Sequence, residues 1–153
     1  KIDTNPYLIG TPDVIIGDLP NATKIIDIKT SFEAKTFISK HYEGLSNLYY
    51  YQLLAYLEIT GARTGEVVFC LVNTPEELIQ DELFRATKRL NCIELPPLKE
   101  AEIRNSMTFD EIPQEQRIIR FQVDYNEEII HKIQQKIDKC REFLHTIHKK
   151  VTK

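Results

Sequence analysis

The sequence has no tryptophan, a single methionine and only three cysteines among its 153 residues. Cys70, Cys92 and Cys140 are odd in number and far apart, and no C-x-x-C pair occurs. This spacing argues against a disulfide framework, a thiolate zinc site and an iron–sulphur cluster held by four cysteines. We therefore expect free, buried thiols.

Long apolar runs and a secretory leader are also missing. No stretch approaches the ~20 apolar residues of a membrane-spanning helix, and the start of the sequence shows no secretory pattern. The four histidines are scattered, without the H-x-x-x-H or H-E-x-x-H spacing of zinc sites. We expect a soluble, intracellular protein with no membrane partner.

The sequence also lacks an excess of basic residues, since its formal net charge is −3. Such a chain has no overall electrostatic footprint for nucleic acid. Binding needs only a local basic surface, however, so DNA is not excluded. The length, with 42% hydrophobic residues, suits one ordinary globular domain with a substantial core. We predict a single domain over residues 1–153.

The most informative feature is a pair of short apolar runs, residues 14–16 and 25–30, joined by a turn. Alternate residues of a strand face opposite sides, so Asp27 and Lys29 share one face. A hairpin at the turn carries Asp13 toward that same face. The sequence therefore predicts two carboxylates and one ammonium group close together.

Charges placed in this way suit metal chemistry. Hard divalent cations such as Mg²⁺ take oxygen ligands, usually one or two carboxylates with water and phosphate oxygens. Asp13 and Asp27 fit that role, with the main-chain carbonyl of Ile28 as a third oxygen, and Lys29 would orient a water or stabilise negative charge. The alternative is a structural aspartate–lysine ion pair. Buried ion pairs rarely improve stability over apolar residues, which favours the functional interpretation.

A helix is predicted over residues 48–60, ending at Gly61, and its nearly continuous apolar surface indicates burial against a sheet. Tyr49, Gln52 and Tyr56 form one stripe that would face the hairpin carboxylates. An aromatic core stripe with one satisfied glutamine is the alternative.

Three motifs together resemble a known family: Pro12-Asp13, Asp27-Ile28-Lys29 and Gln52-Leu53-Leu54-Ala55-Tyr56. They look like the PD-(D/E)XK nuclease superfamily, in its RecB-like and lambda-exonuclease (YqaJ viral recombinase) branch. The D-x-K triplet alone is a weak signal. The ordered set, with its intervening hairpin, is more specific and covers about residues 7–73.

The resemblance implies an α/β fold with a restriction-endonuclease-like core, in which helices flank a central mixed β-sheet. In that family two acids bind Mg²⁺ or Mn²⁺, the lysine serves the nucleophilic water, and the helix glutamine and tyrosine support the site or the DNA. These roles fall on Asp13, Asp27, Lys29, Gln52 and Tyr56. The family's core begins with a helix that often adds a glutamate. Nothing before residue 7 is long enough to form it, so the chain is either a fragment of something larger or lacks an N-terminal part, and a third acidic ligand stays open.

The implied function is a metal-dependent DNA nuclease, an exonuclease of the phage recombination or repair type in the cytoplasm of a prokaryotic or phage-infected cell. One alternative is a catalytically inactive module of this fold that binds DNA or a protein partner. Another is an enzyme that acts on a different phosphate ester, such as RNA. Whether the chain assembles into a homo-oligomer or a larger recombination complex is left open by the sequence.

The segment after the D-x-K triplet is expected to contact DNA. Thr30 and Ser31 supply hydroxyl groups, and residues 32–44 are predicted as a partly ordered loop that carries Lys35, Lys40 and His41. Basic and aromatic groups in one loop suit phosphate contact and base stacking. A solvated loop is the alternative.

The remaining patterns predict scaffold elements in the first part of the chain. A short strand is expected at residues 7–9. The continuous apolar run of residues 66–73 is typical of a strand in the middle of a sheet. Thr74 and Glu77 have the spacing of a capping box at the start of a helix with a buried stripe that ends at Leu90.

Three elements are expected in the last part of the chain. Residues 92–116, with three prolines, are predicted as a long loop that acts as a lid or contact surface. Residues 117–125 alternate like a half-buried edge strand. A long final helix follows Asn126, with a core stripe and a basic end. The stripe comprises Ile130, Ile133, Ile137, Cys140, Leu144 and Ile147, and the basic end comprises Arg141, His145, His148, Lys149 and Lys150.

Overall fold

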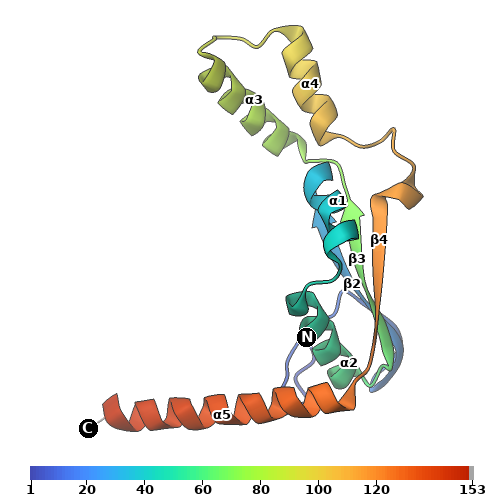
Figure 1. The fold of residues 1–153 in the computed structure, drawn as a ribbon, viewed down its shortest axis with the longest axis vertical. Helices are drawn as coiled ribbons and strands as arrows, with labels where there is room; N and C mark the ends of the chain where they lie inside the picture. The colour runs from blue at the N-terminus through green and yellow to red at the C-terminus, as the bar shows by residue number, and fades with distance from the viewer. Residues whose placement is uncertain (152–153) are drawn as a thin grey trace. The chain divides into compact units, whose positions relative to one another are not determined.

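A computed structural model describes residues 1–151 of the chain, and the side chains of residues 1–147. The chain forms an α/β fold (Figure 1). Its elements in order are β1 (Val14–Asp18), β2 (Asn21–Ser31), α1 (Ala34–Glu43), α2 (Asn47–Thr60), β3 (Thr64–Leu71), α3 (Glu76–Leu90), α4 (Pro97–Met107), the 3₁₀ helix η1 (Gln114–Arg117), β4 (Ile118–Asp124) and α5 (Glu127–Val151). No helix within the described residues is long and apolar enough to cross a membrane.

The four strands form one sheet in the order β1-β2-β3-β4, and β1 and β2 pair as an antiparallel hairpin. The amide of Val72, just after β3, donates to the carbonyl of Ser31 at the end of β2. These two strands therefore run in the same direction. The amide of Tyr125, just after β4, donates to the carbonyl of Arg63, just before β3, so β4 runs the opposite way. The sheet is mixed, β3 is an inner strand and β4 is an edge strand, as the sequence predicted.

The residues group into two compact units; three of the four boundaries between them fall within β2, β3 and β4, and the fourth falls between α1 and α2. The first unit contains residues 1–27, 46–67 and 121–153. Its core forms where α2 meets the strands, and Ile25, Leu53 and Leu57 have no exposed surface. A Cβ atom at Gly65 on β3 would lie 3.2 Å from side-chain atoms of both Leu53 and Leu57. Glycine at this position lets α2 approach the strand closely.

The prediction for the end of α2 is confirmed, whereas the prediction for residues 7–9, before the hairpin, is wrong. Gly61 ends α2 in the left-handed conformation, with φ of 73°, as predicted for a residue after a helix. The strand expected at residues 7–9 is wrong. The side-chain oxygen of Asn5 accepts hydrogen bonds from the amides of Tyr7 and Leu8, at 2.8 and 3.1 Å, and bends the chain there.

The loop predicted over residues 32–44 is also wrong, because Ala34–Glu43 forms the helix α1. Only one apolar side chain of this helix, Phe37, is buried. A single anchor leaves no repeating apolar pattern in the sequence, which explains why the helix was missed. The helix ends at Gly44, whose amide donates to the carbonyl of Lys40 at 3.1 Å.

The second unit contains residues 28–45 and 68–120, and α3 and α4 form a helical pair within it. Ile79, Leu83, Ala86 and Leu95 make a small core, on which Met107 packs. Leu90, predicted in the buried stripe, is instead 53% exposed. The continuous loop expected over residues 92–116 is wrong, since it contains α4 and η1. Pro97 in the first turn of α4 starts the helix rather than breaking it.

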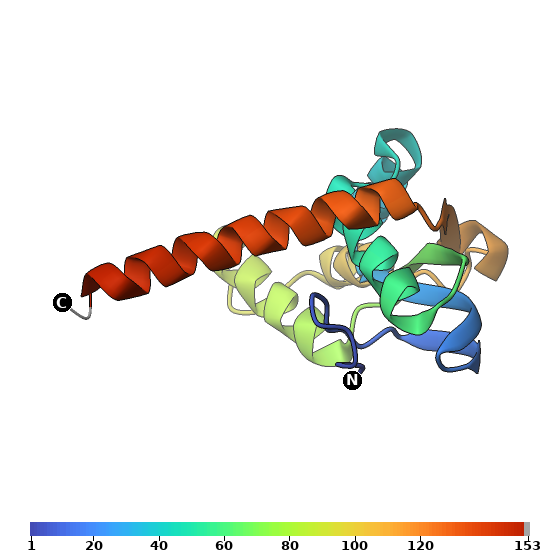
Figure 2. The same cartoon turned by 90° about the horizontal axis from the view of Figure 1, so that it is seen from below.

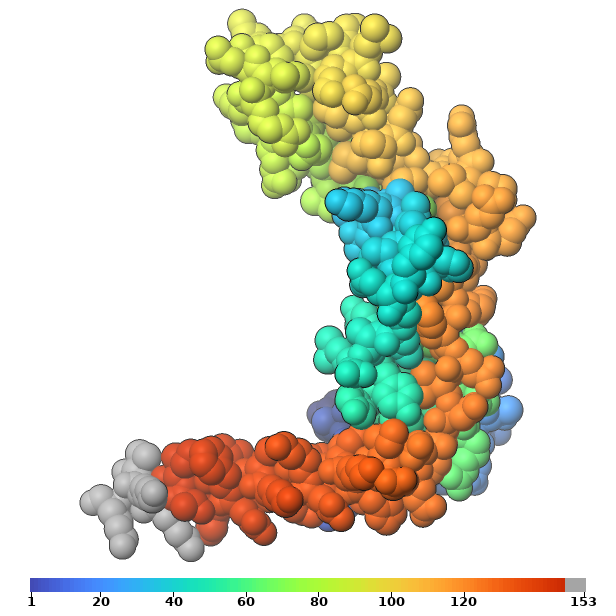
Figure 3. Space-filling view, viewed as in Figure 1, coloured from blue at the N-terminus to red at the C-terminus, as the bar shows by residue number. Residues whose placement is uncertain are grey.

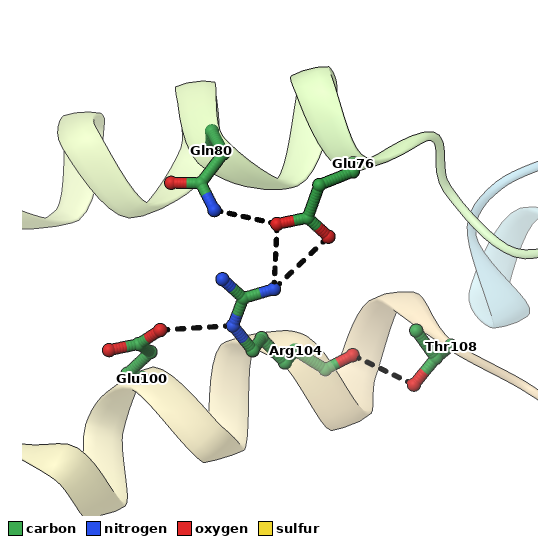
Figure 4. A network of polar contacts seen from close by, with 5 residues as sticks. All are labelled: Glu76, Gln80, Glu100, Arg104 and Thr108. Atoms are coloured by element: carbon green, nitrogen blue, oxygen red, sulfur yellow. Dashed lines mark hydrogen bonds and ion pairs between the residues drawn. The ribbon is translucent and has the colours of Figure 1, made fainter.

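Arg104 of α4 links the two helices of this pair (Figure 4). Its Nη1 lies 2.9 Å from Oε1 of Glu76 on α3, and its Nε lies 3.0 Å from Oε1 of Glu100. Gln80 donates a second hydrogen bond to Glu76. The hydrogen bonds from Gln80 and Arg104 lower the pKa of Glu76. The capping box predicted at Thr74 is absent, because the Thr74 hydroxyl donates to the carbonyl of Phe32 instead.

The last helix begins as predicted, with the side-chain oxygen of Asn126 accepting from the amide of Ile129 at 3.1 Å. Its predicted core stripe is only partly buried: Ile130 is 2% exposed, whereas Leu144 is 64% exposed. Cys140 is a free but exposed thiol, while Cys70 and Cys92 are half-buried. The side chains of His148, Lys149 and Lys150, part of the predicted basic end, lie outside the described residues.

Candidate active site on the β1–β2 hairpin

The paired register of the hairpin ends one position before the two predicted acids. Val14 pairs with Ile26 and Ile15 pairs with Ile25, so the next positions outward are Asp13 and Asp27. Residues directly opposite in an antiparallel pair send their side chains to the same face. A register shift occurs only at the other end of the hairpin, between Ile16 and Gly17. The geometry at the Asp13 end is therefore that of regular pairing up to Val14.

The two acids differ in their surroundings. Asp27 is 2% exposed, and its burial follows that of Ile25 two residues earlier on the same face of β2. Asp13 is exposed, next to the buried Pro12. A carboxylate buried in this way is costly unless it is paired, hydrogen-bonded or bound to a cation. Of the two predicted acids, Asp27 is therefore shielded from solvent and Asp13 is open to it.

β2 continues through the remaining residues of the D-x-K segment. Lys29 is half-buried and follows Asp27 by two positions, so strand alternation places both on one face. The side chain of Ile28 is 42% exposed on the opposite face. The strand therefore places Asp27 and Lys29 on one face as predicted, but the buried Ile25 shares that face and Lys24 lies on the other.

On α2, Gln52 and Tyr56 form a pair. The Nε2 amide of Gln52 donates to the Tyr56 hydroxyl at 3.0 Å, and both side chains are half-buried. The ring of Tyr56 lies against Gly10, where a Cβ atom would come within 2.5 Å of Cε1. No role was assigned to Gly10 from the sequence. A glycine two residues before Pro12-Asp13 is the signal that could have identified this close approach.

The residues predicted to contact DNA lie in the second unit, except for Tyr56. Thr30 and Ser31 line an open cleft of about 460 Å³ with Thr36 and Arg85. The Ser31 hydroxyl also donates to the carbonyl of Glu33 at 3.0 Å. The cleft includes Glu33, Asp81 and Glu82 as well, so its charge is mixed.

Three further candidates are on α1 rather than on a loop. Lys35 and His41 are exposed, and Lys40 forms an ion pair with Glu43 at 2.8 Å. The hydrogen bond and charge of Lys40 lower the pKa of Glu43. Tyr42, which contacts the edge of the His41 ring, is 81% exposed. The exposed part of α1 thus offers basic and aromatic groups to solvent, with Lys40 partly neutralised.

The described residues contain no group of three or more histidine, cysteine, aspartate or glutamate side chains arranged to hold a metal ion. A metal at the hairpin would therefore rely on two carboxylates, with further oxygens from the main chain, water or substrate. This donor set is all oxygen and suits Mg²⁺ or Mn²⁺ better than zinc.

No family model and no curated protein matches this sequence. Two solved structures match the fold. One is a phage-related exonuclease from Haemophilus somnus 129PT, with a TM-score of 0.61 and 17% identity over 84% of this chain. The other is an alkaline exonuclease from Laribacter hongkongensis, with a TM-score of 0.59 and 16% identity over 99% of this chain.

The likeness establishes the fold, which agrees with the fold that the sequence resemblance implied. The chain spans 52% and 57% of the lengths of these two structures, about half of each. The mixed sheet with flanking helices and a long last helix is therefore the architecture of known exonuclease structures.

Proposed function

We propose that this chain is a metal-dependent DNA nuclease, an exonuclease of the phage recombination or repair type that hydrolyses phosphodiester bonds. The observation that carries the proposal is the hairpin register, in which Asp13 and the buried Asp27 each lie one position beyond the last pair, Val14 with Ile26. The fold shared with two exonuclease structures supports it. Because three of the four unit boundaries fall within continuous strands, we treat residues 1–153 as one nuclease-like domain.

Asp13, Asp27 and the main-chain carbonyl of Ile28 would hold the metal, and their oxygen chemistry fits Mg²⁺ or Mn²⁺. When bound, such an ion lowers the pKa of a water molecule and offsets charge on the phosphate. The burial of Asp27 fits the role, because a carboxylate away from bulk water interacts strongly with a cation beside it.

Lys29 would act on the reacting groups. Its ammonium group, on the face of Asp27, would orient the water whose oxygen forms the new bond to phosphorus. It would also stabilise the negative charge that develops on the phosphate oxygens as the bond to the leaving oxygen breaks. The Gln52–Tyr56 pair would support the site or the DNA from α2.

The DNA strand would be held by groups that follow the active-site segment. Thr30 and Ser31 offer hydroxyl groups, and Lys35, Lys40 and His41 offer phosphate contacts from α1. Tyr56 would contact DNA as well. A homo-oligomer or a larger recombination complex is consistent with this function.

The test is to incubate the purified chain with linear and with covalently closed circular DNA, each with Mg²⁺ and with a chelator. We expect loss of linear DNA only when Mg²⁺ is present, while closed circles persist. Asp27→Asn should abolish this activity, and Asp18→Asn, an exposed acid at the other end of β1, should not. Cleavage that is unaffected by the chelator would contradict the proposal.

A second function is a catalytically inactive module of the same fold that binds DNA or a protein partner. The presence of Asp13, Asp27 and Lys29 in the sequence argues against it. The same assay separates the two, because an inactive module would retain DNA binding and show no cleavage with any metal. Preferential loss of an RNA substrate would instead assign the site to another phosphate ester.

A further inference from the structure

The outer half of α5, here residues 140–147, carries an apolar surface that no described residue of its own unit covers. Ile130 is 2% exposed, and Ile133 and Ile137 are half-buried. Beyond them, Phe143 and Leu144 are 65% and 64% exposed. Figures 1 and 2 show this part of the helix extending past α2 and the hairpin, and in Figure 3 its visible face has no segment of its unit against it.

The spacing of this surface is that of a coiled-coil seam. From Ile130 to Ile147 the apolar residues recur at alternating intervals of three and four, which are the a and d positions of a heptad repeat. The inner end of the seam packs within the protein at Ile130, and beside it Ile129, Ile133 and Ile137 line an open hollow with Tyr51 of α2. The exposed outer end continues the same seam, so its geometry suits a second helix.

Positive charge borders one edge of the seam. Lys132, Lys136 and Lys139 follow one another at intervals of four and three, and Lys136 and Lys139 line a second hollow with Cys140, Phe143 and Leu144. Lys132 is neutralised by Glu128 at 2.5 Å. Neither Lys136 nor Lys139 forms an ion pair with an acidic side chain among residues 1–147.

The other edge of the seam contacts the N-terminal segment of the chain through Arg141. Arg141 donates to the carbonyl of Pro6 at 2.6 Å, and its guanidinium group lies over the ring of Tyr7 at 5.2 Å. It also faces Asp138 at 3.8 Å. A partner helix is therefore left with the seam itself and the lysine edge.

We propose that the outer half of α5 docks an amphipathic helix of a partner protein, one whose apolar seam is bordered by acidic side chains. Lysines along the open edge would meet carboxylates along the edge of the partner helix. Such charge pairs beside the apolar seam determine which helices pair with each other. A second copy of this chain fits less well, because its own lysine and arginine borders would oppose Lys136 and Lys139 with like charge. An anionic bilayer is a poorer match for this surface. A membrane surface is flat, whereas the apolar seam is narrow and has a hollow along its lysine edge.

The first experiment uses the whole chain and a labelled three-heptad peptide with leucine at a and d and glutamate at e and g. A control peptide carries lysine at e and g. Fluorescence anisotropy at low ionic strength should show binding of the glutamate peptide at least about tenfold tighter than the lysine peptide, a difference that added salt reduces. Equal affinity for the two peptides would overturn the proposal.

Variants locate the binding surface. Leu144→Asp should abolish peptide binding, and Gln135→Asp, which adds the same charge at an exposed position outside the seam, should not. The paired change Lys136→Glu with Lys139→Glu should reverse the preference toward the lysine peptide. Because Leu144, Lys136 and Lys139 are all exposed, the melting temperature should stay close to that of the wild type.

Two further measurements can reject the proposal. Sedimentation velocity that shows concentration-dependent dimers, lost in Leu144→Asp, would assign the seam to a second copy of the chain. Co-sedimentation with vesicles containing phosphatidylserine, together with no peptide binding, would assign it to an anionic membrane surface. Monomers that stay in solution with neutral and anionic vesicles, and that bind the glutamate peptide, support the partner helix.

Discussion

The side-chain amide of Gln52 donates a hydrogen bond to the hydroxyl of Tyr56, one turn further along α2, at 3.0 Å. The two residues that the sequence motif separates by four positions thus act as one polar pair. The Tyr56 ring in turn lies against Gly10, close to the start of the hairpin that carries Asp13. The helix motif therefore contacts the segment just before the hairpin through the ring of Tyr56.

Gln52→Ala should slow DNA cleavage while the fold stays intact. A lost polar contact costs about 1–3 kcal/mol, which corresponds to roughly 5- to 100-fold in rate if the contact supports the reacting geometry. Single-turnover cleavage and thermal melting measure the two effects separately. Tyr56→Phe removes the same hydrogen bond and keeps the ring, so the double variant should be no slower than the slower single variant. A collapse in melting temperature with unchanged activity per folded molecule would mean that Gln52 is structural.

Asp27→Asn should weaken metal binding and cleavage together, because it halves the formal carboxylate charge of the Asp13–Asp27 pair. Titration calorimetry with Mn²⁺, and crystals soaked in Mn²⁺, would report the metal directly between the two side chains. Asp18→Asn is the matched control on the same hairpin. Full metal affinity in Asp27→Asn would remove this residue from the metal site.

Lys29→Ala should leave metal and DNA binding nearly unchanged and lower the cleavage rate by roughly 10²-fold or more, as expected when one preorganised electrostatic group is deleted. Lys35→Ala, at an exposed position on α1, is the control, and it should weaken DNA binding with little effect on the rate at saturating DNA. If Lys29→Ala melts early and its cleavage scales with the folded fraction, the lysine is part of a structural ion pair.

Gly10→Ala should destabilise the protein by about 1–3 kcal/mol, the usual cost of overpacking. The added methyl group would meet the Tyr56 ring at 2.5 and 2.9 Å, so the ring has to move and its bond to Gln52 is disturbed. Urea denaturation measures the stability, and the cleavage assay measures the effect on the site. In a Tyr56→Ala background the same change should cost much less, because the ring is gone. An equal cost in both backgrounds would contradict this contact.

Tyr125 should ionise late and link stability to alkaline pH. Burial, with the hydrogen bond from its hydroxyl to Glu58 at 2.8 Å and the charge of Glu58, raises the pKa of Tyr125 to about 12. The unfolded value is about 10. The folded state therefore favours the protonated phenol, and this contribution to stability is complete below pH ~10 and is lost as the pH rises toward 12.

The measurement for Tyr125 is the difference in ultraviolet phenolate absorbance between the wild type and Tyr125→Phe during alkaline titration. Glu58→Gln should lower the pKa of Tyr125, because a neutral amide no longer opposes the phenolate charge. Arg63, whose guanidinium lies 4.7 Å from the ring centre, acts in the opposite direction, so Arg63→Gln should raise it further. A titration of Tyr125 with the ordinary tyrosine pKa would contradict the buried contact.

Features that depend on a few neighbouring residues were predictable from the sequence alone. The alternation in β2 placed Asp27 and Lys29 on one face because a strand has a period of two, whatever surrounds it. The continuous apolar run of β3 identified an inner strand, and Gly61 and Asn126 marked helix ends through local backbone and side-chain chemistry. The mixed sheet and the fold were instead implied by the resemblance of three ordered motifs to a known nuclease family.

Tertiary structure decided whatever depends on a partner far away in the sequence. α1 is helical around one buried residue, Phe37, too few to give a periodic pattern. The stripe of α5 has one continuous spacing, but only its inner end meets the rest of its unit, so the same pattern gives a buried Ile130 and an exposed Leu144. The contact of Gly10 with Tyr56 joins residues 46 positions apart and is set by packing, since a glycine shows where a close approach is allowed but not what approaches it.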